Sequence, residues 1–315
     1  MKKLILENPL APGDIVVSTC AIRDLHLAYP GEYKTDIRVP TGAEQIFQHS
    51  PYISKIEDSD PEAIRLRLDY SDIHSSGWSG RPFTGAHAID LAKRIGRPIP
   101  MTSLLPDLHL SHEEKAWPSP VFNEYGYDGQ YWIINAGVKS DYTLKFYHRY
   151  QEVVDMLKGE IQFVQVGQLE HKHPPLEGVL DMRGKTDLRK LFRLSYHADG
   201  SVNAVSLQMV VMAAFQKPCV VVAGGREPIR WQMIPNQRFL AVNGAISCAM
   251  YDGCWKNTLR GSPIKPDGSD PNCVNPVGDH PLCMDMIRPE DIVRAIQLYY
   301  IGGAIKNKAV NYATA

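Results

Sequence analysis

The sequence has no apolar stretch long enough to cross a membrane. A transmembrane helix needs about 20 consecutive apolar residues, and no segment of the 315-residue chain approaches that length. The opening KKLILE is a short apolar run that Asn8 and Pro9 interrupt. A secretory signal needs roughly 7–15 apolar residues and a small-residue cleavage site. We therefore expect a cytoplasmic protein without a membrane span.

The chain also has no excess of charge of either sign. It contains 34 Lys and Arg against 35 Asp and Glu, a net charge of -1. A protein that tracks nucleic acid or anionic lipid by charge needs clustered basic residues, so these partners are disfavoured, although a local basic groove is compatible with the total. At 44% hydrophobic, a chain of this length is typical of two compact domains.

The six cysteines do not form regular CxxC pairs, and a reducing compartment disfavours structural disulfides. Four of them lie within 36 residues among turn-forming residues, with little apolar material between 256 and 281. A bound metal would supply the missing folding energy, and four thiolates suit zinc or iron. We predict a closed, structural metal finger, with free thiols or two disulfides as alternatives, and no catalytic metal. Its ligands are Cys248, Cys254, Cys273 and Cys283.

Strand-like and helix-like segments alternate in two sets. The first set has strands at 2–7, 35–40 and 53–58 and helices at 15–31, 42–50 and 88–96. The second has strands at 130–137, 161–167, 178–184 and 218–225 and helices at 147–159, 186–198 and 204–216. A proline-rich connector, 99–121, separates the two sets.

Alternation of this kind predicts parallel sheets with right-handed crossovers. We expect an α/β protein of two doubly wound, Rossmann-like domains facing a cleft, with ligands at the carboxyl ends of the strands. The predicted divisions are a first domain at 1–125, a second domain at 126–287 that includes the metal finger 248–283, and a C-terminal helix and tail at 288–315.

Four stretches, in their order and spacing, resemble glycosyltransferase family 9, the heptosyltransferases of bacterial surface sugars, which have the GT-B fold. Their sequences are GDIVVSTCAIRDLHLAYPG, NAGVKSDYTLKFYHRY, VQVGQLEHK with DMRGKTDLRKL, and SLQMVVMAAFQKPCVVVAGGREP. In one respect the chain departs from the family. The family usually has Asp-Thr-Gly-x-x-His before the fourth helix, where this chain has VSLQMV at 205–210.

Inverting sugar transfer needs a base for the acceptor proton and cationic or dipolar groups for the leaving diphosphate. Asp14, at a strand-to-helix turn, is the predicted base, and the resemblance implies the same role. The alternative is an aspartate that caps the following helix. Lys145 would reach the diphosphate as a mobile charge. Glu170 would hold ribose hydroxyls, and Ser206 with the adjacent helix amides would hold phosphate.

Two further segments supply candidates. Gly224 and Gly225 follow a buried strand and would let the backbone approach a donor, with Arg226 at the cleft rim; a plain tight turn is the alternative. The segment 74–90 is rich in glycine, aromatic and basic residues. Its Arg81 and His87 are candidate acceptor contacts, and side chains satisfied in a surface loop are the alternative.

Taken together, the residues and the resemblance predict a metal-independent inverting hexosyl- or heptosyltransferase. The donor implied by the resemblance is a nucleotide-diphosphate sugar like ADP-heptose, and the acceptor is a hydroxyl of a saccharide, a protein or a modified DNA base. Autotransporter heptosyltransferases carry a four-cysteine iron finger, which the predicted metal finger resembles. Two alternatives stay open: a glycosyltransferase of hydroxymethylpyrimidine in DNA, and a non-catalytic, GT-B-derived binding or assembly protein. Self-association into a homo-oligomer is also open.

Overall fold

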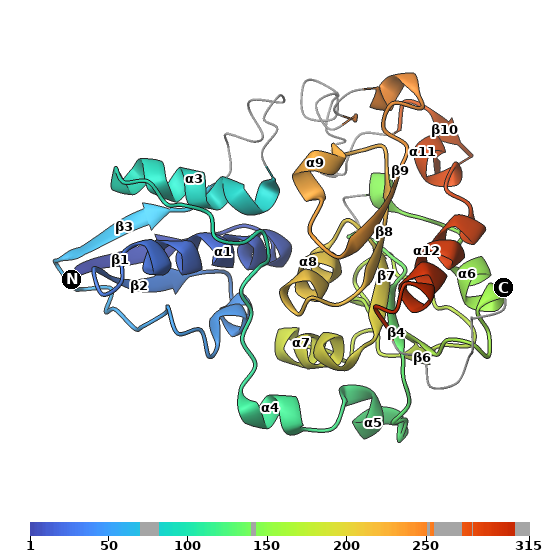
Figure 1. The fold of residues 1–315 in the computed structure, drawn as a ribbon, viewed down its shortest axis with the longest axis horizontal. Coiled ribbons are helices and arrows are strands. Elements are labelled where there is room, and N and C mark those ends of the chain that lie inside the picture. Colours follow the sequence, from blue (N-terminus) through green and yellow to red (C-terminus); the bar gives the residue numbers. More distant parts are fainter. Residues whose placement is uncertain (70–81, 140–142, 251–252, 255–272, 279, 306–315) are drawn as a thin grey trace.

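The computed structural model describes residues 1–69, 82–139, 143–250, 253–254, 273–278 and 280–305. Figure 1 shows two layered α/β units side by side, joined by a connector that carries two short helices, α4 (His112–Ala116) and α5 (Pro120–Tyr125). Among the helices of these residues, none has the length and apolar character needed to span a bilayer.

The first unit is built on a parallel sheet of three strands in the order β2-β1-β3. The strands are β1 (Lys2–Glu7), β2 (Tyr33–Arg38) and β3 (Ala63–Arg67). Helix α1 (Pro12–Ala28) packs against α3 (Phe83–Ile95). Every residue of α1 from Ile15 to Leu25 is buried, so this part of the helix has no solvent face. A helix buried on all sides needs no polar face, which is why its sequence shows little amphipathic pattern.

The second unit contains a six-stranded parallel sheet in the order β6-β5-β4-β7-β8-β9. Its strands are β4 (Trp132–Asn135), β5 (Phe163–Gln165), β6 (Leu180–Asp181), β7 (Gly200–Ala204), β8 (Cys219–Gly224) and β9 (Gln237–Ala241). Helices α7 (Leu188–His197) and α8 (Leu207–Ala214) lie on one side, and α6 (Tyr150–Met156) and α12 (Pro289–Ile301) on the other (Figure 1).

Both faces of this sheet are buried. Ile133 and Val221 belong to the apolar core on the side of α7 and α8, whereas Ile134 and Val220 belong to the core on the side of α6 and α12. Neighbouring residues of one strand point to opposite faces. Strands covered on both faces read as continuous apolar runs, which explains why β4 and β8 are evident from sequence.

The central strand β7 was missed by the sequence prediction because its residues, GSVNA, are small or polar. All five are buried, and their polar groups pair internally: the Ser201 hydroxyl donates to Asn203 Oδ1 at 2.8 Å, and Asn203 Nδ2 donates to the Ala204 carbonyl at 2.9 Å. The half-buried edge strand β9 was also missed. Buried polar groups are tolerated when hydrogen-bonded. Polar residues can therefore form a central strand, and their polarity does not by itself indicate a loop.

Two expectations for the first unit were wrong. Residues 53–58 form no strand; Ile53 makes only an isolated bridge to Thr35, and the edge strand is β3. The helix expected at 42–50 is a short 3₁₀ turn, η1 (Ala43–Phe47). The proline-rich connector contains α4, which has a full capping box. In the second unit, the helix expected at 186–198 is α7, which has Asp187 as its N-cap.

One guanidinium ties the two units and the connector together. Arg189 on α7 donates from Nε to Glu114 Oε1 on α4 at 3.0 Å and from Nη2 to Glu114 Oε2. Its Nη2 also donates to the His109 carbonyl at 3.0 Å, and its Nη1 to the Gln45 carbonyl of η1 at 3.3 Å. The side chains of Arg189 and Glu114 are only 11% and 7% exposed. This joint connects α7 of the second unit with the connector and with η1 of the first unit.

Candidate active site

The carboxyl ends of the two sheets meet where two helices begin. Strand β1 leads into α1, and β7 leads into α8. The two helices pack together (Figure 1), and a Cβ built on Gly13 would lie 3.5 Å from Leu207 Cα, the first residue of α8. The N-terminus of α1 in the first unit therefore contacts the N-terminus of α8 in the second.

Asp14 lies at this junction, as the third residue of α1, and is half-buried. The capping position belongs to Ala11, whose side chain makes no capping hydrogen bond. The alternative role as a capping aspartate is therefore wrong. A carboxylate in the first turn is still favoured by the helix dipole, and that of Asp14 belongs to the turn of α1 that contacts α8.

His87 does not lie in a surface loop. It is fully buried in α3, where burial lowers its pKa to about 4, while the Asp69 charge and the backbone carbonyl of Asp14 act in the opposite direction. The imidazole is therefore neutral at neutral pH and packs against the backbone of the candidate base. The other acceptor-side candidate, Arg81, lies outside the described residues.

Ser206 is the N-cap residue of α8, in extended conformation, but its side chain makes no capping hydrogen bond. Its Oγ is buried, and within the described part of the chain no group hydrogen-bonds to it. The first N–H groups of α8 thus have no cap from this serine. An uncapped helix N-terminus is a ready site for a phosphate or carboxylate.

Lys145, at the end of η2 (Thr143–Lys145), joins a buried ionic cluster. Its Nζ lies 2.7 Å from Glu227 Oε1, and Arg226 Nη1 lies 2.6 Å from the same oxygen. The side chains of Arg226 and Glu227 are 2% and 3% exposed, and that of Lys145 is 18% exposed. Burial acts to raise the pKa of Glu227, but the charges and hydrogen bonds of Lys145 and Arg226 outweigh it and lower the pKa.

Arg226 is therefore not at a cleft rim, where the sequence placed it, because its guanidinium is buried against Glu227. The preceding residues, Gly224 and Gly225, face described residues of the cysteine-rich segment 248–283. A Cβ on Gly224 would lie 3.2 Å from Cys283 Sγ, and one on Gly225 would lie 2.7 Å from Ala249 Cβ. Close packing against this segment is thus an observed reason for both glycines.

Glu170 is exposed in a turn that follows β5. The same loop returns to the end of β4, where Val138 and Lys172 exchange backbone hydrogen bonds of 3.1 Å. A Cβ on Gly137 would lie 2.1 Å from the Lys172 carbonyl, so glycine is needed for this approach. The loop therefore lies beside the strand that leads to Lys145.

The cysteines approach one another without forming a closed centre. Asn275 donates from its backbone N to Cys273 Sγ at 3.4 Å and from Nδ2 to Cys248 Sγ at 3.7 Å. Burial raises the pKa of Cys283 to about 11; the Gly225 N–H acts to lower it, and Cys273 and Cys248 to raise it. Across the residues that the structure describes, no group of three or more His, Cys, Asp or Glu is placed to hold a metal ion. The predicted metal finger is therefore not shown.

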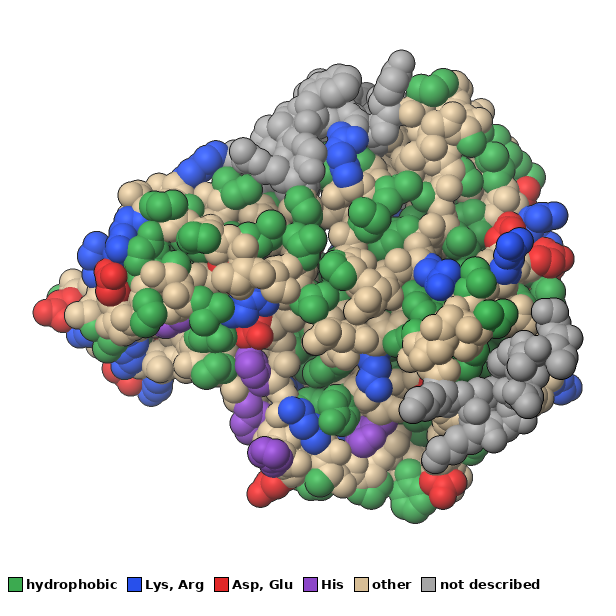
Figure 2. Space-filling view, viewed as in Figure 1, with side chains coloured by type: hydrophobic (Ala, Val, Ile, Leu, Met, Phe, Trp, Pro, Cys, Tyr) green, Lys and Arg blue, Asp and Glu red, His purple; other side chains and the backbone are tan. Residues whose placement is uncertain are grey.

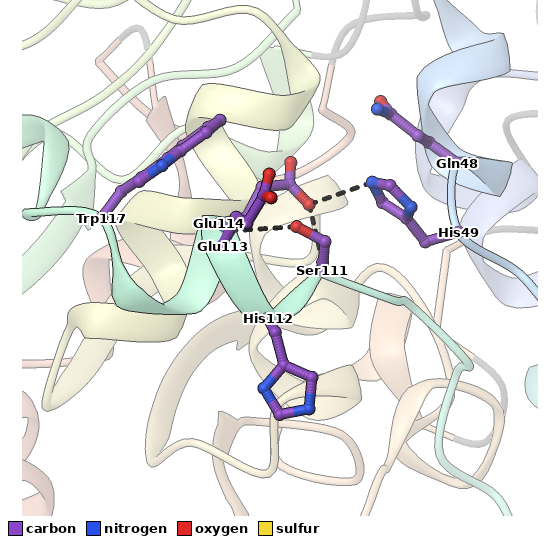
Figure 3. A pocket seen from close by; sticks show the side chains of 7 residues that line it. All are labelled: Gln48, His49, Ser111, His112, Glu113, Glu114 and Trp117. Atoms are coloured by element: carbon purple, nitrogen blue, oxygen red, sulfur yellow. Dashed lines mark hydrogen bonds and ion pairs between the residues drawn. The ribbon is translucent and has the colours of Figure 1, made fainter.

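An open hollow of about 460 Å³ lies on the connector. Figure 3 shows Glu114 turned toward His49 and Ser111, whereas His112 points away. His49 Nε2 lies 3.4 Å from Glu114 Oε2, which already binds Arg189. The hollow thus belongs to the joint between the units and contains none of the candidate site residues. Its lining is Gln48, His49, Ser111, His112, Glu113, Glu114 and Trp117.

No protein-family model matches the chain, and no curated protein matches it in sequence. Solved structures do match. A glycosyl transferase family 9 protein from Veillonella parvula superposes with a TM-score of 0.66 and 13% identity, over 96% of this chain and 98% of that one.

Two E. coli structures match comparably. ADP-heptose lipopolysaccharide heptosyltransferase II gives a TM-score of 0.64 at 14% identity, over 96% of this chain and 100% of that one. The iron-containing dodecameric glycosyltransferase TibC gives 0.64 at 15% identity, over 95% and 78%. At such identities the likeness shows the fold. The chain has the parallel α/β fold of GT-B glycosyltransferases, which confirms that part of the sequence prediction.

Proposed function

We propose that the chain is an inverting glycosyltransferase that moves a heptose-like sugar from a nucleotide-diphosphate donor to a hydroxyl acceptor. One observation carries the proposal: the contact between the start of α1, which bears Asp14, and the start of α8, where Ser206 leaves helix amides uncapped. The proposed base and the proposed anion site would thus meet at the carboxyl ends of two parallel sheets, where such folds bind ligands.

In this proposal Asp14 takes the proton of the acceptor hydroxyl as that oxygen attacks the anomeric carbon. The leaving nucleoside diphosphate carries negative charge away from the sugar. The N-terminal dipole of α8 and the ammonium of Lys145 would stabilise it. None of these steps needs a catalytic metal. Glu170, Gly224 and Gly225 remain proposed donor contacts. The buried Arg226 would act on the donor indirectly, through its contact with Glu227.

The donor class is supported by the ligands of similar structures. The E. coli heptosyltransferase WaaC was solved with ADP, and TibC was solved with an ADP-heptose. We propose an ADP-heptose-like donor for this chain by that likeness of fold. On the face in Figure 2, Lys and Arg side chains of the described residues are scattered rather than gathered. This face offers no basic track for a DNA acceptor.

We propose a separate role for the unit built on each sheet. We propose residues 1–125 as the acceptor-side unit and 126–287 as the donor unit. Helix α12, in the proposed C-terminal segment 288–315, packs on α6 and β8 of the donor unit. A cytoplasmic location also remains our proposal.

A structural zinc or iron ion on Cys248, Cys254, Cys273 and Cys283 is the proposed cofactor. Its support is an all-thiolate donor set with N–H groups of Asn275 aimed at two of the sulfurs, together with the iron content of TibC. Elemental analysis of purified protein should find about one metal per chain. Cys273→Ser should lower the metal content, whereas Cys219→Ser, at a cysteine buried in β8, should keep it. Equal content in both variants would refute the assignment.

Transfer chemistry is tested with nucleotide sugars and mass spectrometry. Binding of an ADP- or UDP-sugar should raise the melting temperature, and slow release of nucleoside diphosphate should accompany it. Asp14→Asn should keep donor binding and lower turnover by roughly 10²–10⁴-fold, the usual contribution of a general base. Absence of binding by any nucleotide sugar would overturn the proposal and favour the non-catalytic binding protein.

A further inference from the structure

We propose that Glu227 is the residue that positions Lys145 for the donor diphosphate, and that Arg226 fixes Glu227. This inference rests on the proposed function, because it assigns a role within the same site. Lys145 lies far from Arg226 and Glu227 in the chain, whereas Arg226 and Glu227 are adjacent to each other. The meeting of Lys145 and Arg226 on one carboxylate oxygen is a finding of the structure.

The geometry leaves Glu227 little freedom. Its side chain is 3% exposed, and Oε1 accepts from both Lys145 Nζ at 2.7 Å and Arg226 Nη1 at 2.6 Å. Arg226 is itself buried, so its guanidinium holds the carboxylate of Glu227 in place from the interior of the protein. Lys145 is the most exposed member of the cluster. A lysine side chain has four rotatable bonds and is otherwise a mobile charge, so the fixed carboxylate determines where the ammonium stays.

The charges of these three side chains suit an anionic ligand. Two cations contact one carboxylate at the end of β8 and the end of η2, so positive charges outnumber negative ones among the three. If Glu227 faced Lys145 alone, the pair would be neutral and would attract a diphosphate weakly. Arg226 therefore has two effects: it keeps Glu227 ionised in a buried position, and it restores the positive charge. A buried carboxylate without partners would instead take up a proton.

The cluster also touches the cysteine-rich segment. A Cβ on Gly253 would lie 2.2 Å from the Arg226 carbonyl and 2.5 Å from the Gly225 carbonyl. Gly253 precedes Cys254, and only glycine permits this backbone approach at its φ of 71°. The backbone on which Arg226 and Glu227 sit is thus packed directly under that segment.

The first experiment is a double-mutant cycle for nucleotide binding, with ADP as the probe and UDP as a second probe. Lys145→Ala should weaken binding by about 10–100-fold, and Glu227→Gln by about tenfold, because the ammonium is no longer held. The double variant should bind no more weakly than Lys145→Ala alone, since Glu227 acts through the lysine. Independent, additive losses would overturn the inference.

Controls separate positioning from folding. Glu124→Gln removes the carboxylate of a partly exposed lysine pair, Lys185–Glu124 at 2.8 Å, and should leave binding unchanged. Glu227→Asp keeps the charge but shortens the side chain, so it should fold and still bind ADP more weakly. Wild-type affinity in Glu227→Asp or in Glu227→Gln would show that Lys145 needs no positioning and would overturn the inference.

A second measurement needs no nucleotide. The rate at which an amine-reactive acylating reagent modifies Lys145 is followed by peptide mass spectrometry, with Lys185 in the same sample as reference. Glu227→Asp and Glu227→Gln should raise the rate at Lys145 several-fold and leave Lys185 unchanged. An unchanged ratio would overturn the inference. If the wild-type protein bound no nucleotide while the labelling changed as expected, the proposed function would fail and the positioning of Lys145 would stand.

Discussion

Glu114 offers a sharp test of how the two units are joined. Its carboxylate is 7% exposed and accepts two hydrogen bonds from Arg189, whose guanidinium also reaches the first unit through the Gln45 carbonyl (Figure 3 shows the neighbouring side chains). Glu114→Gln removes the negative charge and leaves the guanidinium buried with only carbonyl partners and one amide oxygen. Removal of one partner of a buried ion pair costs about 3–5 kcal/mol.

We expect the lower end of that range, about 3 kcal/mol, because the glutamine oxygen still accepts one hydrogen bond. The assay is urea unfolding followed by tryptophan fluorescence, compared at equal m-value. The matched control is Glu152→Gln, which removes a carboxylate from the exposed i,i+3 pair Arg149–Glu152 at 2.8 Å. Surface pairs of this kind contribute less than about 1 kcal/mol.

The pH dependence adds a second check on Glu114. Burial acts to raise its pKa, but the hydrogen bonds and charge of Arg189 prevail and lower it. The contribution of this pair to the free energy of unfolding is therefore fully present above the ordinary glutamate pKa. It is lost as the pH falls through the lowered pKa of the folded state. The difference between wild type and Glu114→Gln should shrink in acid. A cost equal to that of Glu152→Gln at neutral pH would refute the reasoning.

Three further outcomes follow from the structure. Burial lowers the pKa of His87 to about 4 in the folded chain, against about 6.5 in the unfolded chain. Protonation of this group should therefore lower the free energy of unfolding by about 3 kcal/mol as the pH falls from 6.5 to 4. In His87→Leu, the free energy of unfolding should depend less on pH over this range. Gly253→Ala should lower thermal stability by more than Gly178→Ala, because both glycines have positive φ but only Gly253 lies against backbone carbonyls. Removing the proposed metal with a chelator should weaken the proposed binding of ADP, measured by calorimetry, since Gly253, next to Cys254, packs on the backbone of Arg226.

Several elements were predictable because their sequences carry a local signal. Strands β4 and β8 are apolar throughout since both faces are covered, and α12 has proline at its start with Glu290 and Asp291 in its first turn. Asp14 was singled out by its place after a strand. By contrast, β7 was missed because Ser201 and Asn203 satisfy each other inside the sheet, and a pattern of hydrophobicity cannot register such pairing.

The candidate site, too, was predictable from the sequence only in part. The sequence identified Lys145 and Arg226 by their positions at strand ends, but it placed Arg226 at a rim. Tertiary packing buried that guanidinium and made Glu227 the carboxylate that Lys145 and Arg226 share. It also buried His87 behind Asp14, because α3 packs on α1.

Local sequence thus determined the class of fold, the alternation of strands and helices, and the chemistry of the candidate residues, because these depend on residues that are neighbours in the chain. Only the tertiary structure decided which residues meet. The contact between α1 and α8, the joint at Arg189 and Glu114, and the cluster around Glu227 all join segments that are distant in sequence. Burial and pairing depend on those long-range contacts, and no local pattern encodes them.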